Sequence, residues 1–283
     1  MKLNFHHMNL EALPKIEVPI AAITHLSLFD NAFTTIPVEI YNMKNIKTLN
    51  ISVNKIRHMP ADIGNLTELT MLDAGHNDID VIPPEIENLH NIEDYLYLHN
   101  NKLQSIPPEI AKLVKVKYLN LSDNQLLQLP NELGQLNKLI ELRVMNNQLT
   151  ELPTTIGCLS NLKELHVKNN QLTILPANVG QLSLLRVLDV EENQLKAIPQ
   201  SIYKCLSLRR LNLRHNQLTT LPEEIGRLQN LLEIDLRSNL LTELPKSLLD
   251  IEGLERLDLR WNHDLQVPSW LGDLQEKGCI VYL

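Results

Sequence analysis

One asparagine recurs along the whole chain at almost constant spacing, and this regularity constrains the fold more than any other feature. Consecutive members of the set lie 23 residues apart, with a single step of 24. The set is Asn31, Asn54, Asn77, Asn101, Asn124, Asn147, Asn170, Asn193, Asn216, Asn239 and Asn262. A period in this range, with apolar residues at fixed offsets, is typical of stacked repeats that cannot bury their apolar faces alone. The sequence therefore predicts a solenoid.

The first half of each repeat has the pattern of a short strand. Within residues 139–161, Leu142 and Val144 alternate with the charged Glu141 and Arg143. Alternation with a period of two predicts a strand with one buried face and one open face. Stacking such repeats predicts a parallel sheet, whose open face carries the residues that are free to vary.

The recurring asparagine follows each predicted strand, at the point where the chain has to turn. A turn inside a stacked coil leaves backbone groups buried, and an orphaned buried group costs about 1–3 kcal/mol. The carboxamide of Asn147 both donates and accepts hydrogen bonds, so it can satisfy such groups. We expect the asparagines to form a hydrogen-bonded ladder inside the coil.

An aliphatic residue followed by proline opens the second half of each repeat, as in Leu129-Pro130 and Leu152-Pro153. Twelve of the fifteen prolines occupy this slot. Because proline lacks an N–H group and has a helical φ, we expect it at the first position of a short helix or 3-10 turn. The predicted fold class is α/β: a right-handed solenoid with a concave parallel β-sheet and short convex helices or 3-10 turns.

The phase of the repeat gives the predicted organisation. Residues 1–22 form a partial first repeat or N-terminal cap, residues 23–276 form eleven repeats, and residues 277–283 form a bare strand or C-terminal cap. One repeat has an extra residue before its first strand leucine, Leu96. The insertion predicts a β-bulge that bends the strand and re-aims Tyr95.

The 23-residue repeat with a Leu-Pro or Ile-Pro pair resembles the intracellular leucine-rich-repeat class. That class includes Ras-binding scaffold and Ras-suppressor repeats and bacterial leucine-rich-repeat effectors. The resemblance covers essentially the whole chain. It implies a horseshoe-shaped leucine-rich-repeat solenoid and protein–protein recognition through the concave sheet.

Composition excludes several other classes. The formal net charge is −8 and the pI is about 5.7, whereas a nucleic-acid-binding protein has a basic footprint. The three cysteines form no recognisable disulfide framework, which predicts reduced thiols and a cytoplasmic location, or the host cytosol for a bacterial effector. No apolar run reaches 18 residues, so no membrane insertion is expected.

Catalysis, metal binding and a bound cofactor are not expected. The ten histidines include the adjacent His6 and His7, and His76 and His99 fall on neighbouring strands, yet neither pair has a third ligand in sight. Neither H-E-x-x-H nor C-x-x-C occurs, and there is no glycine-rich phosphate loop. The sequence therefore predicts a non-enzyme without cofactors.

The predicted partner-binding residues lie at open strand positions. Tyr95, Tyr97, His99 and Tyr118 form a central cluster on neighbouring strands, in a chain with only 4% aromatic residues. Tyrosine, tryptophan and arginine dominate interface hot spots. The alternative is that aromatic residues simply suit strands.

Other residues extend the predicted partner-binding surface towards both ends of the chain. These residues are Phe29, Met145, Arg214, Arg237, Arg260 and Trp261. The three arginines occupy the same position in consecutive repeats, where their like charges repel unless carboxylates neutralise them. An acidic strip on a partner could do so, or internal pairing with Asp235 and Asp258.

Two functions remain open at this stage. The first is an intracellular scaffold or adaptor in signalling that binds a protein partner, with a small GTPase among the candidates. The second is a substrate-recognition repeat domain of a secreted bacterial effector or of a larger enzyme.

Overall fold

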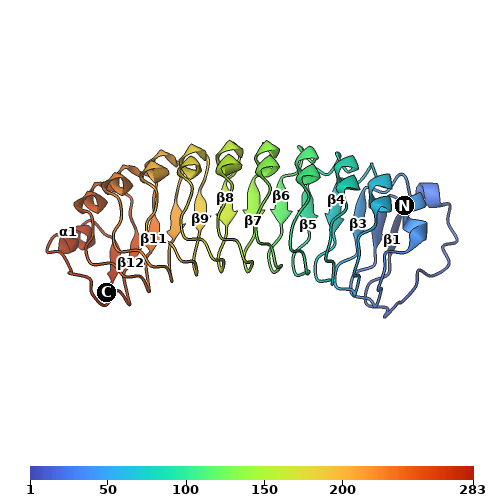
Figure 1. Cartoon of the computed structure of the whole chain (residues 1–283), viewed down its shortest axis with the longest axis horizontal. Coiled ribbons are helices and arrows are strands. Elements are labelled where there is room, and N and C mark those ends of the chain that lie inside the picture. Colours follow the sequence, from blue (N-terminus) through green and yellow to red (C-terminus); the bar gives the residue numbers. More distant parts are fainter. The chain divides into compact units, whose positions relative to one another are not determined.

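The computed structural model describes all 283 residues and contains two compact units, Met1–Asn147 and Gln148–Leu283. Both units repeat one motif, in which a three-residue strand is followed by a loop and a short 3-10 turn (Figure 1). The first unit contains β1 (Lys2–Asn4), η1 (Ile20–Ala22), β2 (His25–Ser27), η2 (Val38–Asn42), β3 (Thr48–Asn50), η3 (Ala61–Asn65), β4 (Met71–Asp73), η4 (Pro84–Asn88), β5 (Tyr95–Tyr97), η5 (Pro108–Lys112), β6 (Tyr118–Asn120), η6 (Asn131–Gln135) and β7 (Glu141–Arg143). The second contains η7 (Thr154–Cys158), β8 (Glu164–His166), η8 (Ala177–Gln181), β9 (Val187–Asp189), η9 (Gln200–Lys204), β10 (Arg210–Asn212), η10 (Glu223–Arg227), β11 (Glu233–Asp235), η11 (Lys246–Asp250), β12 (Arg256–Asp258), α1 (Leu271–Glu276) and β13 (Ile280–Tyr282).

The strands of each unit pair in parallel and in sequence order. In the first unit this order runs from β1 to β7, and in the second from β8 to β13. Equivalent residues of successive repeats lie opposite one another, so that Leu49 pairs with Leu72. The predicted α/β solenoid of parallel strands and 3-10 turns is confirmed.

The core of each unit is built from the middle residue of every strand except β1 and β13, and from the aliphatic residues of the loops. Leu72, Leu96, Leu188 and Ile234 have no exposed surface. Full burial of one such side chain contributes about 1.5–3 kcal/mol. The first and third strand residues remain on the open side of the sheet, which we call the strand face.

The predicted asparagine ladder is present in both units. Asn124 is 8% exposed. Its Oδ1 accepts a hydrogen bond from the Leu103 backbone N–H of the preceding repeat at 3.0 Å. Its Nδ2 donates to the carbonyl oxygens of Leu98, Leu121 and Ser122 at 3.0–3.1 Å. The carboxamide therefore joins two repeats through backbone groups that water does not reach.

The residue before each ladder asparagine has a left-handed backbone. Its φ lies between 51° and 62° in every repeat from Asp30 to Trp261. Asparagine tolerates this conformation, as at Asn100 and Asn146, whereas the β-branched Val53 is strained by it. The left-handed turn that positions each ladder asparagine therefore strains the backbone in some repeats.

The expectation that proline takes the first helical position is wrong by one residue. Pro130 precedes η6 with an extended backbone, at φ −67° and ψ 146°. Its carbonyl oxygen accepts the first hydrogen bond of the turn, from the Leu133 N–H at 3.1 Å. The same placement holds in every repeat from Pro37 to Pro245. Pro130 thus occupies the N-cap, where its fixed φ sets the approach to the turn.

The predicted bulge before β5 is confirmed by the register. In most repeats two consecutive N–H groups share one acceptor, and the second donor is the first strand residue, as at Thr48. Before β5 the two donors to the Thr70 carbonyl oxygen are Glu93 and Asp94, and the strand begins one residue later. Only Leu96 and Tyr97 then pair with β4, where other strands of this unit pair three residues. The extra residue is absorbed at Asp94, directly before the strand that carries two tyrosines.

Candidate partner-binding surface

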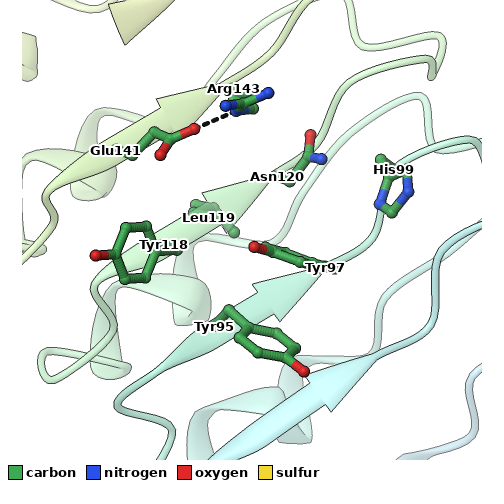
Figure 2. Close-up of a pocket in the computed structure, with 8 residues that line it drawn as sticks. All are labelled: Tyr95, Tyr97, His99, Tyr118, Leu119, Asn120, Glu141 and Arg143. Carbon is green, nitrogen blue, oxygen red and sulfur yellow. Dashed lines mark hydrogen bonds and ion pairs between the residues drawn. The ribbon is translucent and has the colours of Figure 1, made fainter. Parts of the chain in front are cut away.

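Three tyrosines and a histidine line one hollow on the strand face of the first unit. Tyr95 and Tyr97 project from β5, Tyr118 projects from β6, and His99 follows β5 (Figure 2). The hollow has a volume of about 490 Å³. Its other lining residues are Leu119, Asn120, Glu141 and Arg143. We call it the tyrosine hollow.

The repeat register brings these residues together. Tyr118 stands opposite Tyr95 in the β5–β6 pair, and Glu141 stands opposite Tyr118 in the β6–β7 pair. Side chains at equivalent positions of adjacent strands are about 5 Å apart. Residues that are 23 positions apart in the sequence therefore share one wall of the hollow.

The aromatic rings pack against one another in a defined order. The rings of Tyr95 and Tyr97 stack with centroids 4.4 Å apart and planes 21° apart. The ring of His99 meets Tyr97 edge-on at 5.9 Å. Tyr118 remains 37% exposed across the hollow. Stacking holds part of the aromatic surface in place before any partner arrives.

His99 is held where a side chain at Gly75 would otherwise be. A Cβ atom at Gly75 would lie 2.5 Å from Cε1 of His99, so a side chain there would force the ring to shift. The ring also meets His76 edge-on at 4.9 Å. Burial lowers the pKa of His99, and its buried Nδ1 has no hydrogen-bond partner. His99 is therefore favoured as a neutral imidazole.

Charge around the tyrosines is predominantly negative. Arg143 forms an ion pair with Glu141 on the same strand. Burial raises the pKa of Tyr97, and the Glu141 carboxylate raises it further. Burial also raises the pKa of Tyr95, with Asp73 as the next cause. Both phenols therefore stay protonated at neutral pH and can donate as well as accept hydrogen bonds.

The structure brings together the four residues of the predicted central cluster. Sequence reasoning did not place Asn120, Glu141 and Arg143 in the same site, although all three line the hollow. Asn120 lies one repeat after Tyr97, and Glu141 and Arg143 lie two repeats after Tyr95 and Tyr97, so the repeat spacing was the signal that could have identified them. Whether the hollow binds a partner remains a prediction.

Phe29 and Met145 lie outside the hollow. Phe29 follows β2 and packs edge-on against His6 and His7, at centroid distances of 5.5 and 5.2 Å. Met145 follows β7 and is half-buried, and its backbone N–H donates to the Ser122 hydroxyl at 3.2 Å. Met145 therefore follows a strand that lines the tyrosine hollow, whereas Phe29 follows a strand three positions away from β5 in the sheet.

The arginine series of the second unit is paired internally. Arg237 binds the Asp235 carboxylate and lies 3.5 Å from that of Asp258. Arg260 donates to Asp258 at 2.6 and 2.9 Å. These contacts give the internal-pairing alternative a structural basis.

Arg214 is the third member of this series, and it forms an ion pair with Glu191. The two side chains approach to 3.5 Å. Asn212 also donates to the Glu191 carboxylate, at 3.0 Å. Because all three arginines pair with carboxylates of the chain itself, their charges do not require an acidic partner at this surface.

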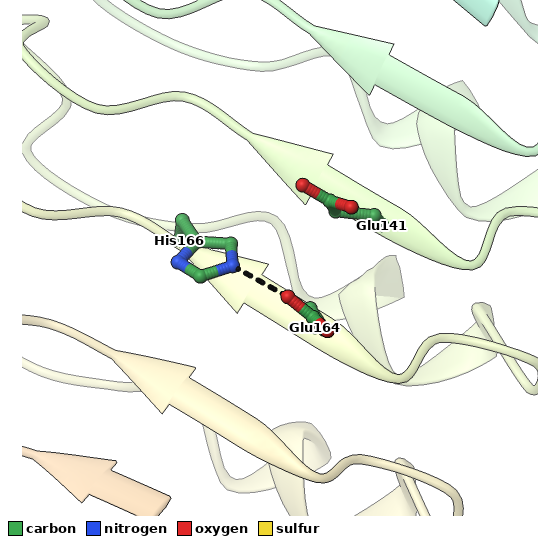
Figure 3. Close-up of side chains that lie close together, drawn as sticks. All are labelled: Glu141, Glu164 and His166. Carbon is green, nitrogen blue, oxygen red and sulfur yellow. Dashed lines mark hydrogen bonds and ion pairs between the residues drawn. The ribbon is translucent and has the colours of Figure 1, made fainter.

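A smaller hollow of about 260 Å³ lies on the strand face of the second unit. His166 lines it, and its Nε2–H donates a hydrogen bond to the Glu164 carboxylate at 3.1 Å (Figure 3). Asp189 is the second acidic neighbour of the ring, at 4.0 Å. Because Arg210 and Arg256 flank Glu233 in register, opposite charges alternate around this hollow.

Trp261 lies at the far end of the second unit. It is 51% exposed and has a φ of 62°. The Arg260 guanidinium lies over its ring at 5.5 Å and over the ring of Tyr282 at 5.0 Å. Of the predicted residues, only the four of the central cluster line the tyrosine hollow.

Comparison with known proteins decides the family. Models of leucine-rich repeats match residues 21–79, 95–183 and 184–276, and the two longest matches alone cover more than half of the chain. The chain belongs to the leucine-rich-repeat proteins. No curated protein sequence is significantly similar to it.

Solved leucine-rich-repeat structures resemble the chain along most of its length. A leucine-rich-repeat protein of Leptospira interrogans is 26% identical, with 99% of this chain and 95% of that chain covered and a TM-score of 0.61. The plant peptide hormone receptor RGFR1, solved in complex with RGF2, is 29% identical over 86% of this chain and 42% of that chain, with a TM-score of 0.76.

A second plant receptor structure is similar to the chain to a comparable degree. The ectodomain of the receptor kinase GASSHO1/SCHENGEN3 from Arabidopsis thaliana, in complex with CASPARIAN STRIP INTEGRITY FACTOR 2, is 28% identical, with a TM-score of 0.76. That match covers 94% of this chain and 36% of that chain. The chain thus spans less than half of either plant receptor. None of its own helices is both long and apolar enough to cross a lipid bilayer.

Proposed function

We propose that this leucine-rich-repeat chain recognises a protein partner through the tyrosine hollow. The observation that carries the proposal is the convergence of Tyr95, Tyr97 and Tyr118 on one hollow of about 490 Å³. Tyrosine offers a large contact area at a low cost in side-chain entropy, since it has only two rotatable angles. Tyrosines are also enriched among the residues that carry most of the binding energy at interfaces.

Preorganisation of the hollow supports this proposal. The stacked pair of tyrosines and the His99 ring held over Gly75 need little reordering on binding. A surface that is ordered beforehand loses less entropy on association. The plant receptors RGFR1 and GASSHO1/SCHENGEN3 were solved with bound partners, which is consistent with a recognition role for such a solenoid.

We propose an intracellular scaffold or adaptor as the role of this recognition. The resemblance of the 23-residue repeat to Ras-binding scaffolds supports it, as do the three cysteines, which are all free thiols. A small GTPase is a candidate partner on the same resemblance. Disulfides are rare in reducing compartments, so free thiols are the expected state there.

The second candidate is a target-recognition module of a bacterial effector or of an enzyme. The observation that favours it is the match to the Leptospira interrogans protein, which extends over nearly the full length of both chains. Both candidates use the same hollow for recognition. They differ in the identity of the protein that the hollow selects.

Affinity capture with paired variants tests the proposal. Wild type and the Tyr97→Ala/Tyr118→Ala double variant are used as baits, and captured proteins are quantified by mass spectrometry. The matched control is Tyr203→Ala, which removes a tyrosine from η9, outside the strand face. We expect at least one protein to be retained by wild type and by the control and lost by the double variant. A set of captured proteins that is identical for all three baits would refute the proposed site.

A further inference from the structure

The carboxylates around the tyrosine hollow outnumber the cations. Glu141 lines the hollow, Asp73 stands on β4 opposite a hollow tyrosine, and Asp94 directly precedes β5. Arg143 is the only cation in the lining, and it already binds Glu141. Lys117, which directly precedes β6, forms an ion pair with Glu93. Asp73 and Asp94 lie outside the lining but close to Tyr95, and neither takes part in an ion pair of the structure. The excess of negative charge therefore lies beside the hollow, next to the β5 tyrosines.

Asp73 is positioned but not neutralised. It is half-buried, and its Oδ1 accepts a hydrogen bond from the Gly75 backbone N–H at 3.1 Å. Burial raises the pKa of Asp73 despite this bond. A partially desolvated carboxylate without a counter-charge favours the approach of a cation.

The aromatic rings also attract cations. The face of a tyrosine ring is electron-rich and attracts ammonium and guanidinium groups. The phenolic oxygens of Tyr97 and Tyr118 can accept hydrogen bonds from such groups. An acidic side chain in the same place would meet the carboxylates and the negative ring faces together. Shape, ring chemistry and charge thus favour one class of occupant.

We propose that the tyrosine hollow receives an arginine or lysine side chain of the protein partner, seated against the tyrosine rings and paired with the Asp73 carboxylate. The inference rests on the proposed function of the hollow as a docking surface and specifies the chemistry of what docks there. It predicts that the partner needs this basic residue in order to bind.

Selection from a random peptide display library on the full-length chain tests this inference. Peptides are kept when they bind wild type and fail to bind the Tyr97→Ala/Tyr118→Ala double variant. We expect each kept peptide to contain an arginine or a lysine. In arginine-containing peptides, substitution by citrulline, which has nearly the same shape without the charge, should weaken binding at least tenfold.

Variants of the chain test the carboxylate. Asp73→Asn keeps the size and the hydrogen-bond acceptor, and it should weaken the arginine peptides about threefold to tenfold. The matched control is Glu132→Gln, which removes a carboxylate from η6 of the same unit, away from the hollow. It should change binding by less than twofold.

The possible results separate this inference from the proposed function. Tyrosine-dependent peptides without basic residues, or with affinities unchanged by citrulline, would overturn the cation inference and leave the docking surface standing. A library that yields no tyrosine-dependent peptide would overturn both.

Discussion

Replacing one ladder asparagine tests how the repeats are held together. In Asn124→Ala the Leu103 N–H loses its only acceptor, and this amide belongs to a residue with no exposed surface. An orphaned buried donor costs about 1–3 kcal/mol. The carbonyl oxygens of Leu98, Leu121 and Ser122 each keep another donor, so their loss is smaller. We expect the free energy of unfolding to fall by about 2–4 kcal/mol in total.

Urea unfolding followed by circular dichroism measures this loss, and hydrogen exchange locates it. The Leu103 amide should exchange much faster in Asn124→Ala, while amides several repeats away keep their protection. The matched control is Asn65→Ala on the exposed side of η3, where the carboxamide binds only Asp62. It should change stability by less than about 0.5 kcal/mol. Equal effects of the two variants would refute the ladder as a source of stability.

Three further predictions concern single sites. Val53→Asn should stabilise the fold by about 0.5–1 kcal/mol in urea titrations, because asparagine tolerates the positive φ that strains valine. Cys158 is exposed, whereas burial raises the pKa of Cys205 to about 12, so one thiol should react rapidly with Ellman's reagent in the native chain and all three in urea. Burial raises the pKa of Asp73, so the fold disfavours its charged form; Asp73→Asn should raise the urea midpoint at pH 7, and this gain should vanish as the pH falls below about 3.8.

Each of these predictions can fail in a distinct way. A lower urea midpoint for Val53→Asn would mean that valine packing outweighs the backbone strain. Rapid labelling of Cys205 in the native state would mean that the repeat opens locally. A gain from Asp73→Asn that persists at acidic pH would mean that the substitution acts through something other than charge.

Sequence periodicity predicted the strands, the ladder and the bulge because each depends on local spacing. The step of 24 residues between Asn77 and Asn101 located the insertion, and the register of β4 and β5 confirmed it. The position of proline was harder to predict. Sequence alone does not distinguish the start of an α-helix from the approach to a 3-10 turn, and Pro130 proved to lie before the turn.

The site could be predicted only in part. Positions one repeat apart identify neighbours on the strand face, so the central tyrosines could be grouped. Which side chains close around a hollow depends on ring orientation and ion pairing, which periodicity does not encode. The stacking of Tyr95 on Tyr97 and the pairing of Arg143 with Glu141 therefore emerged only from the structure.

The dissociation constant of a captured partner for the Tyr97→Ala/Tyr118→Ala variant tests the docking surface most directly. Removal of two hot-spot tyrosines should cost about 2 kcal/mol or more, which is about a thirtyfold loss of affinity. Thermal unfolding should stay close to wild type, because both side chains project from the strand face. A dissociation constant within twofold of wild type, with the fold intact, would contradict the account.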